Sequence, residues 1–211
     1  MTDGRSAALV RRHAELLDRA CAIRFVREAT EGALDAGDFA RYLVVEEAFV
    51  LTASRVLGRV VWESTGWADL LPHARSLTNL VTEQRDYFAG LRDRWPAEDG
   101  AGALARAAVL SEVVLGQVQA SGRPAALAGM LAAETMYARW CTEAAARPVT
   151  RDPDLQAWID LHAQPPFLAQ VAALQADVDA LPVDAAPDAA LDRWFAAVLT
   201  AEIAFHDAVH G

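Results

Sequence analysis

The chain has 211 residues, of which 54% are hydrophobic, and a formal net charge of −10. This composition excludes an intrinsically disordered protein. The acidic balance argues against nucleic acid as a partner, because it repels phosphate groups. No stretch is apolar over the ~18 residues that a membrane span requires, and the N-terminus lacks the basic head and apolar core of a signal peptide. We therefore expect a cytoplasmic protein that binds neither nucleic acid nor membrane.

The residue pattern predicts an all-α fold, because alanine and leucine dominate while valine, isoleucine and threonine do not gather into alternating runs. Asp38 can cap a long third helix, Pro72 can break the fourth, and residues 121–124 form a turn before the sixth. No repeat or linker is visible, so a single helical bundle is expected over residues 1–211. In chain order the helices are expected at about 6–20, 23–33, 38–62, 67–95, 103–120, 124–147, from 153 to the prolines at 165 and 166, 167–180 and 187–209.

Four of these helices place a polar side chain in the middle of an apolar stripe. At 100° per residue, Glu46, Glu134 and Glu202 each fall at the centre of such a stripe, and so does His162. No lysine or arginine shares the stripes, and an unpaired buried carboxylate costs several kcal/mol. These glutamates could share protons, bind a cation or hold a ligand rich in hydrogen-bond donors. Any one of them could instead cap a helix or pair with a distant arginine, but three together with a histidine favour a functional site.

Other candidates are weaker. His13 and His73 lie in polar or proline-marked surroundings and are expected at the surface. His206 and His210 share a helical face one turn apart, which suits either a metal pair or a histidine that complements the helix dipole. The two cysteines are far apart inside helical patterns and are expected to be buried free thiols, at Cys21 and Cys141.

Three segments are similar, in order and spacing, to the TenA/thiaminase II family. The first is FVREATEGALDAGDFARYLVVEEAFVL, which resembles the family's run from Phe through Gly-x-Leu and Phe-x-x-Tyr-Leu to an acidic residue. The second, LQAWIDLHAQPPFLAQV, resembles its Trp-Ile segment, and the third, AEIAFHDAVH, its C-terminal Glu-x-x-Phe motif. They cover residues 25–51, 155–171 and 201–210.

This resemblance implies a haem-oxygenase-like helical bundle, usually a homo-oligomer (a dimer or tetramer), that hydrolyses aminopyrimidines in thiamin salvage without a cofactor or metal. By position, Glu46 matches the acidic residue that binds the pyrimidine, and Glu202 matches the active-site glutamate. Glu134 stands where cysteine-type members have their nucleophile, which resembles the glutamate-type branch that hydrolyses amino- and formylamino-pyrimidines. Cys141, about two turns further along, is out of register as a substitute. The remaining matches are aromatic or replace a tyrosine, and they are Phe49, Tyr137, His162 and Phe205.

The leading interpretation is therefore a hydrolase of a C–N bond in a flat, amine-bearing heterocycle. Glu134 and Glu202 would act as its acid and base, because carboxylates in different surroundings can hold different pKa values. Two alternatives remain open. One is a di-iron oxygenase on the same fold, although histidines one turn from each glutamate are scarce. The other is a non-catalytic pyrimidine-binding homologue. No helix-turn-helix pattern supports a transcription regulator.

Overall fold

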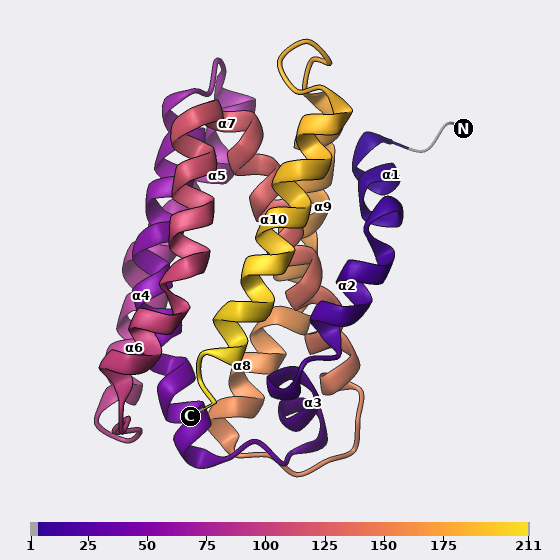
Figure 1. The fold of residues 1–211 in the computed structure, drawn as a ribbon. Helices are drawn as coiled ribbons and strands as arrows, with labels where there is room; N and C mark the ends of the chain where they lie inside the picture. The colour runs from indigo at the N-terminus through magenta and orange to yellow at the C-terminus, as the bar shows by residue number, and fades with distance from the viewer. Residues whose placement is uncertain (1–3, 211) are drawn as a thin grey trace. The chain divides into compact units, whose positions relative to one another are not determined.

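A computed structural model describes residues 4–210, and all the regular structure within this range is helical. The all-α prediction is confirmed, and Figure 1 shows the helices in chain order. They are α1 (Arg5–Arg12), α2 (Ala14–Cys21), α3 (Arg24–Glu31), α4 (Ala36–Trp62), α5 (Trp67–Asn79), the π-helical turn η1 (Leu80–Gln84), α6 (Arg85–Arg92), α7 (Gly100–Ala145), α8 (Pro153–Ala163), α9 (Pro165–Ala180) and α10 (Asp188–Asp207).

The described chain divides into two compact units that alternate along the sequence. Unit 1 contains residues 4–34 and 127–203, and unit 2 contains residues 35–126 and 204–210. Two helices belong to both units, because α7 and α10 each continue across a boundary. A single domain over the whole chain stays a prediction.

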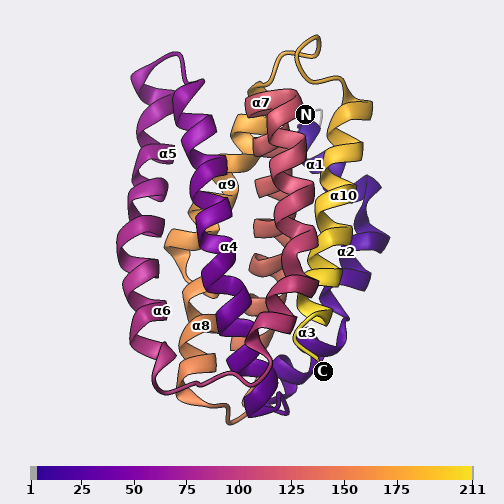
Figure 2. The ribbon, with the colours of Figure 1, turned by 60° about the vertical axis from the view of Figure 1, so that its left-hand side comes forward.

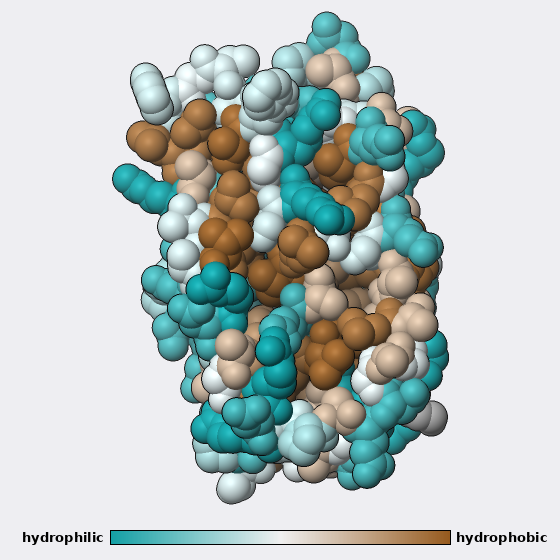
Figure 3. All heavy atoms as spheres, turned by 90° about the vertical axis from the view of Figure 1, so that its left-hand side faces the viewer, coloured by the Kyte–Doolittle hydropathy of each residue, from teal (hydrophilic) through white to brown (hydrophobic). Residues whose placement is uncertain are grey.

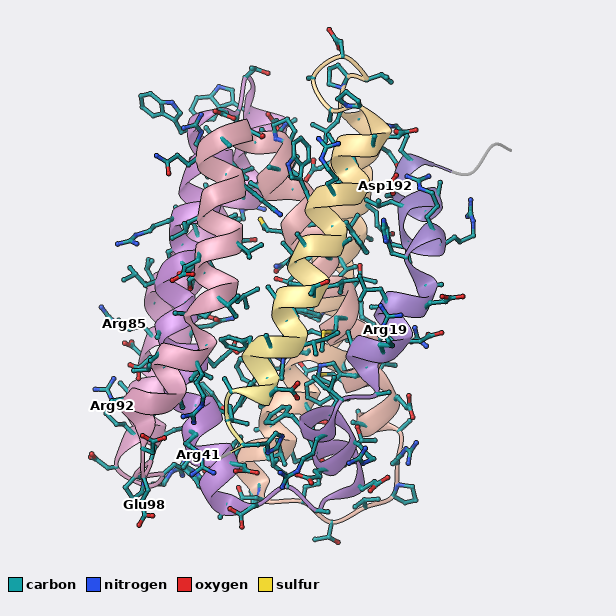
Figure 4. The ribbon with its side chains drawn as sticks, viewed as in Figure 1. Arg19, Arg41, Arg85, Arg92, Glu98 and Asp192 are labelled. Carbon is teal, nitrogen blue, oxygen red and sulfur yellow. The ribbon has the colours of Figure 1, made fainter. Side chains whose placement is uncertain are left out.

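In unit 1, ion pairs fasten α1 to α10. Arg5 Nε donates to Asp188 Oδ1 at 2.9 Å, and Arg12 Nε donates to Asp192 Oδ1 at 2.9 Å. Figure 2 shows α1 and α2 beside α10, and Figure 4 shows Asp192 on the side of α10 toward α1. Such exposed pairs contribute at most about 1 kcal/mol each, so the apolar core provides most of the stability. That core includes Phe25, Leu127, Trp140, Trp158, Ile159 and Phe195.

A buried arginine caps two helix ends in unit 1. The side chain of Arg151 donates to the backbone oxygens of Ala29 at 2.8 Å, Thr30 at 2.5 Å and Ala144 at 2.9 Å. These carbonyls lie in the last turns of α3 and α7, where a helix leaves its carbonyl groups without partners. One guanidinium group therefore stabilises the ends of both helices.

In unit 2, α5, η1 and α6 pack along the long helix α4 (Figure 2). Asp35 caps α4, because its carboxylate accepts a hydrogen bond from the backbone N–H of Gly37 at 2.8 Å. The predicted cap at Asp38 is therefore wrong by three residues, and Asp38 lies inside the first turn with 5% exposure. Its side chain is held instead by Arg41 on the same helix and by the distant His210.

Helix α7 passes through a backbone kink at Gly122, where φ is 63° and ψ is −145°. Positive φ favours glycine, because it has no Cβ. The backbone N–H of Arg123 donates to Glu63 Oε2 at 2.6 Å, and its guanidinium pairs with Asp69. A Cβ at position 122 would lie 2.8 Å from the same Glu63 oxygen. The break predicted at residues 121–124 is therefore present, as a non-helical kink at which two helical stretches of α7 join.

Residues 208–210, the C-terminal segment, are held by side chains of α4 and α7 in unit 2. Arg106 Nε donates to the backbone oxygen of residue 208 at 3.1 Å, and Arg41 Nε donates to that of residue 209 at 2.5 Å. His210 Nδ1 lies 2.6 Å from Asp38 Oδ2, and the other oxygen of Asp38 pairs with Arg41. Figure 4 shows Arg41 near this end of the chain. Three successive residues are therefore each anchored.

Apolar side chains of α4, η1 and the region around the α4–α5 turn also reach the surface of unit 2. Trp62 and Trp67, on either side of that turn, are 82% and 76% exposed. Leu51, Leu71 and Val81 are between 43% and 59% exposed. Figure 3 shows brown apolar patches on the face that carries these helices. Contiguous exposed apolar surface often marks an interaction site.

Several predicted boundaries are wrong. The helix expected at 6–20 is two helices, because the backbone leaves the helical conformation at His13 (φ −104°, ψ 18°). The helix expected at 67–95 continues through Pro72 and is interrupted instead by η1. Within residues 4–210, α7 is the one helix that could cross a membrane by length and composition, with an 18-residue window of mean hydropathy 1.3. The expectation that no stretch of ~18 residues is sufficiently apolar is therefore wrong for α7. Core helices of soluble proteins can be equally long and apolar, so α7 is only weak evidence for a membrane span.

Candidate functional site

The seven predicted site residues are divided between the two units. Unit 1 contains four of them, which are Glu134 and Tyr137 on α7, His162 on α8 and Glu202 on α10. Unit 2 contains three, which are Glu46 and Phe49 on α4 and Phe205 on α10.

Glu202 is the most deeply buried of the three glutamates, with 1% exposure. Phe195, Val198 and Leu199 on the same helix are equally buried, so the predicted apolar stripe around Glu202 is confirmed. Close packing of α10 against α7 shields this stripe, because a Cβ added to Gly129 would lie only 3.3 Å from Val198 Cγ2. Removing a carboxylate from water is costly, so Glu202 is an unusual residue for this position of an apolar helix face.

Glu134 is half-buried on α7 and contacts α9. Its Oε1 accepts a hydrogen bond from Gln170 Nε2 at 3.4 Å. Leu127 and Leu131 on the same stripe are fully buried, while Arg139 on the opposite face is exposed, as the periodicity predicts. The sequence reasoning missed Gln170. Its available signal was an amide beside Val171 in a helix that contains other polar residues, which is too weak to identify a partner for Glu134.

His162 lies among aromatic rings contributed by α7, α8 and α9. Its ring centroid is 5.1 Å from that of Tyr137, 4.3 Å from that of Trp158 and 4.7 Å from that of Phe167. Nδ1 lies 2.8 Å from the backbone oxygen of Trp158. Burial lowers the pKa of His162 from 6.5 to about 4, against the opposing effect of that hydrogen bond. The imidazole is therefore neutral at physiological pH. Trp158 and Phe167 were not among the predicted site residues.

In unit 2, the rings of Phe49 and Phe205 lie together, with centroids 5.7 Å apart and planes tilted by 59°. Phe205 is 2% exposed, and Phe49 and Glu46 are half-buried. Tyr42 stacks on His206 at 5.8 Å. This pairing of α4 with the last turn of α10 brings together two of the residues that the resemblance identifies.

The histidines and cysteines that the sequence offered as weaker candidates differ in their burial and contacts. His13 is half-buried beside Asp192. His73 is 5% exposed, so the predicted surface position of His73 is wrong. His206 is fully buried, while His210 lies beyond the end of α10, so the premise that both share one helical face is wrong. Cys21 and Cys141 are thiols outside any disulfide, as predicted, although only Cys141 is fully buried. Burial raises the pKa of Cys21 to about 11, which disfavours a reactive thiolate.

Unit 2 contains a pocket of about 370 Å³ beside the N-terminal end of α4. Arg41, Arg94, Trp95 and Glu98 are among the residues that line it, and Figure 4 labels Arg41 and Glu98. None of the seven predicted site residues lines this pocket. This pocket therefore does not coincide with the predicted site residues.

Comparisons with known proteins establish the fold. No protein-family model matches the sequence, and no curated protein matches it. A TenA homologue from P. horikoshii OT3 superposes with a TM-score of 0.83 at 15% identity, over 98% of each chain. A TenA family transcription regulator from a Silicibacter species gives 0.83 at 18% identity, over 99% of this chain and 98% of that one.

A third structure, from Sulfolobus solfataricus, carries a name that proposes a TenA-like thiaminase. Its TM-score is 0.71 at 15% identity, over 99% of this chain and 96% of that one. Identities this low establish architecture and leave activity to be argued from the site. The protein thus has the all-α fold of the TenA homologues, as the sequence resemblance implies.

Proposed function

We propose that this protein is a member of the TenA/thiaminase II family, in its glutamate-type branch. Its proposed activity is hydrolysis of a C–N bond in an aminopyrimidine-type substrate of thiamin salvage. The shared fold and the three matching segments support this proposal. The observation that carries it is the Glu202 carboxyl group, which is 1% exposed on an apolar helix face in the same unit as Glu134.

The proposed reaction consumes one water molecule and needs one base and one acid. With an aminomethylpyrimidine, the water oxygen bonds to the carbon that carries the departing nitrogen while one carboxylate takes a proton from the water. As the C–N bond breaks, the other carboxyl group protonates the nitrogen, so the products are a hydroxymethylpyrimidine and ammonia. Glu134 and Glu202 would divide these roles, since one is half-buried and the other fully buried, and carboxyl groups in different surroundings can serve as acid and as base.

Binding roles are proposed for the other residues of the resemblance. Glu46 would accept hydrogen bonds from the amino group and a protonated ring nitrogen of the pyrimidine. Phe49, Tyr137 and Phe205 would contact the faces of the heterocycle, as aromatic side chains commonly do. His162 would contact the substrate where the family commonly has tyrosine.

The test is ammonia release from aminomethylpyrimidine. With formylaminomethyl-pyrimidine, a first hydrolysis should release formate and a second should release ammonia. Glu202→Gln keeps the shape of the side chain and removes its proton transfer, so we expect kcat to fall about a hundredfold or more. Glu143→Gln on exposed α7 surface is the matched control and should leave kcat unchanged. Circular dichroism checks the fold of both variants. Undiminished turnover by Glu202→Gln would reject the mechanism.

The same preparations separate the alternatives. A non-catalytic homologue would bind the pyrimidine in calorimetry without releasing ammonia. A metal-dependent oxygenase would retain stoichiometric iron after anaerobic loading, and elemental analysis measures this directly. Either result would replace the hydrolase proposal.

A homo-oligomer and a cytoplasmic location are also proposed. Exposed Trp62 and Trp67 support the oligomer, because large aromatic side chains are enriched at interfaces. Light scattering should show a mass above that of one 22.7 kDa chain. Trp62→Ala with Trp67→Ala should lower that mass, and an unchanged oligomer would place the interface elsewhere.

A further inference from the structure

One nitrogen atom of the buried His162 ring has no protein partner. His162 is only 6% exposed. Nδ1 lies 2.8 Å from the backbone oxygen of Trp158, while Nε2 has no hydrogen bond to any group within residues 4–210. Nε2 is not one of the buried polar atoms that lack both a hydrogen-bond partner and contact with solvent. Solvent can therefore reach it.

The chemistry of Nε2 follows from the partner of Nδ1. A backbone carbonyl oxygen can only accept a hydrogen bond, so Nδ1 must carry the proton that it donates to Trp158. The imidazole is neutral, since burial lowers its pKa to about 4. A neutral imidazole has one N–H, which leaves Nε2 with a lone pair and no proton. This atom is consequently an acceptor alone, unlike a tyrosine hydroxyl, which both donates and accepts.

The surroundings of His162 narrow the kind of donor that fits. The rings of Tyr137 and Phe167 lie 5.1 and 4.7 Å from the imidazole by centroid, from two neighbouring helices. Aromatic walls suit a flat molecule, and a ligand that displaces water from Nε2 must supply an N–H or O–H in its place or leave the acceptor unsatisfied at a cost. The aromatic surroundings and the unpaired acceptor favour a planar, amine-bearing ligand.

We infer that His162 Nε2 is a specificity-determining acceptor, which binds an N–H group of a planar amine-bearing substrate and discriminates against analogues that lack a donor at that point. The inference rests on the proposed function for the class of substrate, and it adds the atom that selects it. His162 takes no part in breaking the bond.

Nitrogen NMR of the ¹⁵N-histidine-labelled protein tests this on the wild type. Aminomethylpyrimidine at saturation should shift the Nε2 resonance of His162 toward that of a hydrogen-bonded acceptor, while Nδ1 stays protonated. His13 is the internal control, because its Nε2 already lies 3.0 Å from Asp192 and should not respond. Loss of one resonance in His162→Gln assigns the signal. An unchanged Nε2 resonance at saturation, or the absence of binding, would overturn the inference.

Binding of methylated probes tests selectivity. In two analogues, the protons of the ring amino group or of the aminomethyl group are replaced by methyl groups. The analogue that lacks the N–H bound by Nε2 should bind the wild type about tenfold more weakly than the parent pyrimidine in calorimetry, and the other analogue should not. His162→Phe should remove that difference, and His162→Gln, which keeps an acceptor oxygen, should restore part of it. Equal binding of the parent and both analogues to the wild type would contradict the inference.

These outcomes separate the inference from the proposed hydrolysis. Ammonia release with an unresponsive Nε2 would leave the hydrolase intact and reject the role of His162. A responsive Nε2 without ammonia release would support His162 as the acceptor and reject hydrolysis.

Discussion

His162 in unit 1 and His210 in unit 2 each have an unpartnered ring nitrogen, but they differ in the partner of the other nitrogen and in solvent access. Each has an Nε2 atom without a hydrogen-bond partner within residues 4–210. His162 Nδ1 faces a neutral carbonyl among aromatic rings, whereas His210 Nδ1 lies 2.6 Å from the Asp38 carboxylate that Arg41 also contacts. The Nε2 of His210 is sealed from solvent, and that of His162 is not. Access and the charge of the partner therefore distinguish a candidate ligand contact from a structural anchor.

The largest effect should come from the anchor in unit 2. Arg41→Ala removes the donor to the backbone oxygen of residue 209 and takes the arginine away from the buried Asp38 carboxylate. Breaking a buried pair from one side costs about 4 kcal/mol of unfolding free energy. Urea denaturation measures the loss. Arg55→Ala, at an exposed position on the same helix, should cost less than about 0.5 kcal/mol. Equal losses would show that the C-terminal segment is not held as we describe.

Acid should affect stability through His162. Its folded pKa of about 4 lies below the ordinary value of 6.5, so over this interval the unfolded chain binds a proton that the folded chain does not. The free energy of unfolding should therefore rise with pH from 4 to 6.5, by about 3 kcal/mol from this group. This contribution of His162 to the free energy of unfolding is fully present above pH 6.5 and is lost as the pH falls toward 4. Urea denaturation of His162→Gln should lack this part of the slope. The same slope in both proteins would contradict a neutral, buried His162.

The smallest effect should come from Gln170, and it should concern turnover more than stability. Gln170→Leu removes the 3.4 Å hydrogen bond to Glu134 while keeping a similar volume. Losing one such bond is worth about 1 kcal/mol, so kcat should fall about fivefold. The midpoint of urea unfolding should stay nearly constant. A large loss of stability with unchanged kcat would make Gln170 a structural residue like Arg41.

The sequence predicted the features that depend on neighbours along one helix. The stripe around Glu202 is buried as its periodicity indicates, and Arg139 faces outward. The helical pattern depends on spacing within a few turns, which a single sequence contains. For the same reason the turn at residues 121–124 was located, although its form as a kink was not.

Contacts between distant segments were beyond the sequence. The sequence pattern keeps arginines off the apolar stripes, yet Arg41 is half-buried because it reaches the C-terminal segment. His73 was expected at the surface, but it is buried. Gln170 gained significance only from Glu134, which is 36 residues away in the chain. Such partners depend on which helices become neighbours, and periodicity carries no information on that.

The kink at Gly122 has a consequence for how this sequence can evolve. A Cβ at this position would meet the Glu63 carboxylate, which also holds the backbone N–H of Arg123. A shorter residue at 63 would relieve the contact but would leave that N–H without its acceptor and the positive φ still strained. Among descendants of this chain, the two positions should therefore be inherited as a pair. Where glycine at 122 is replaced, the acidic residue at 63 should have changed as well.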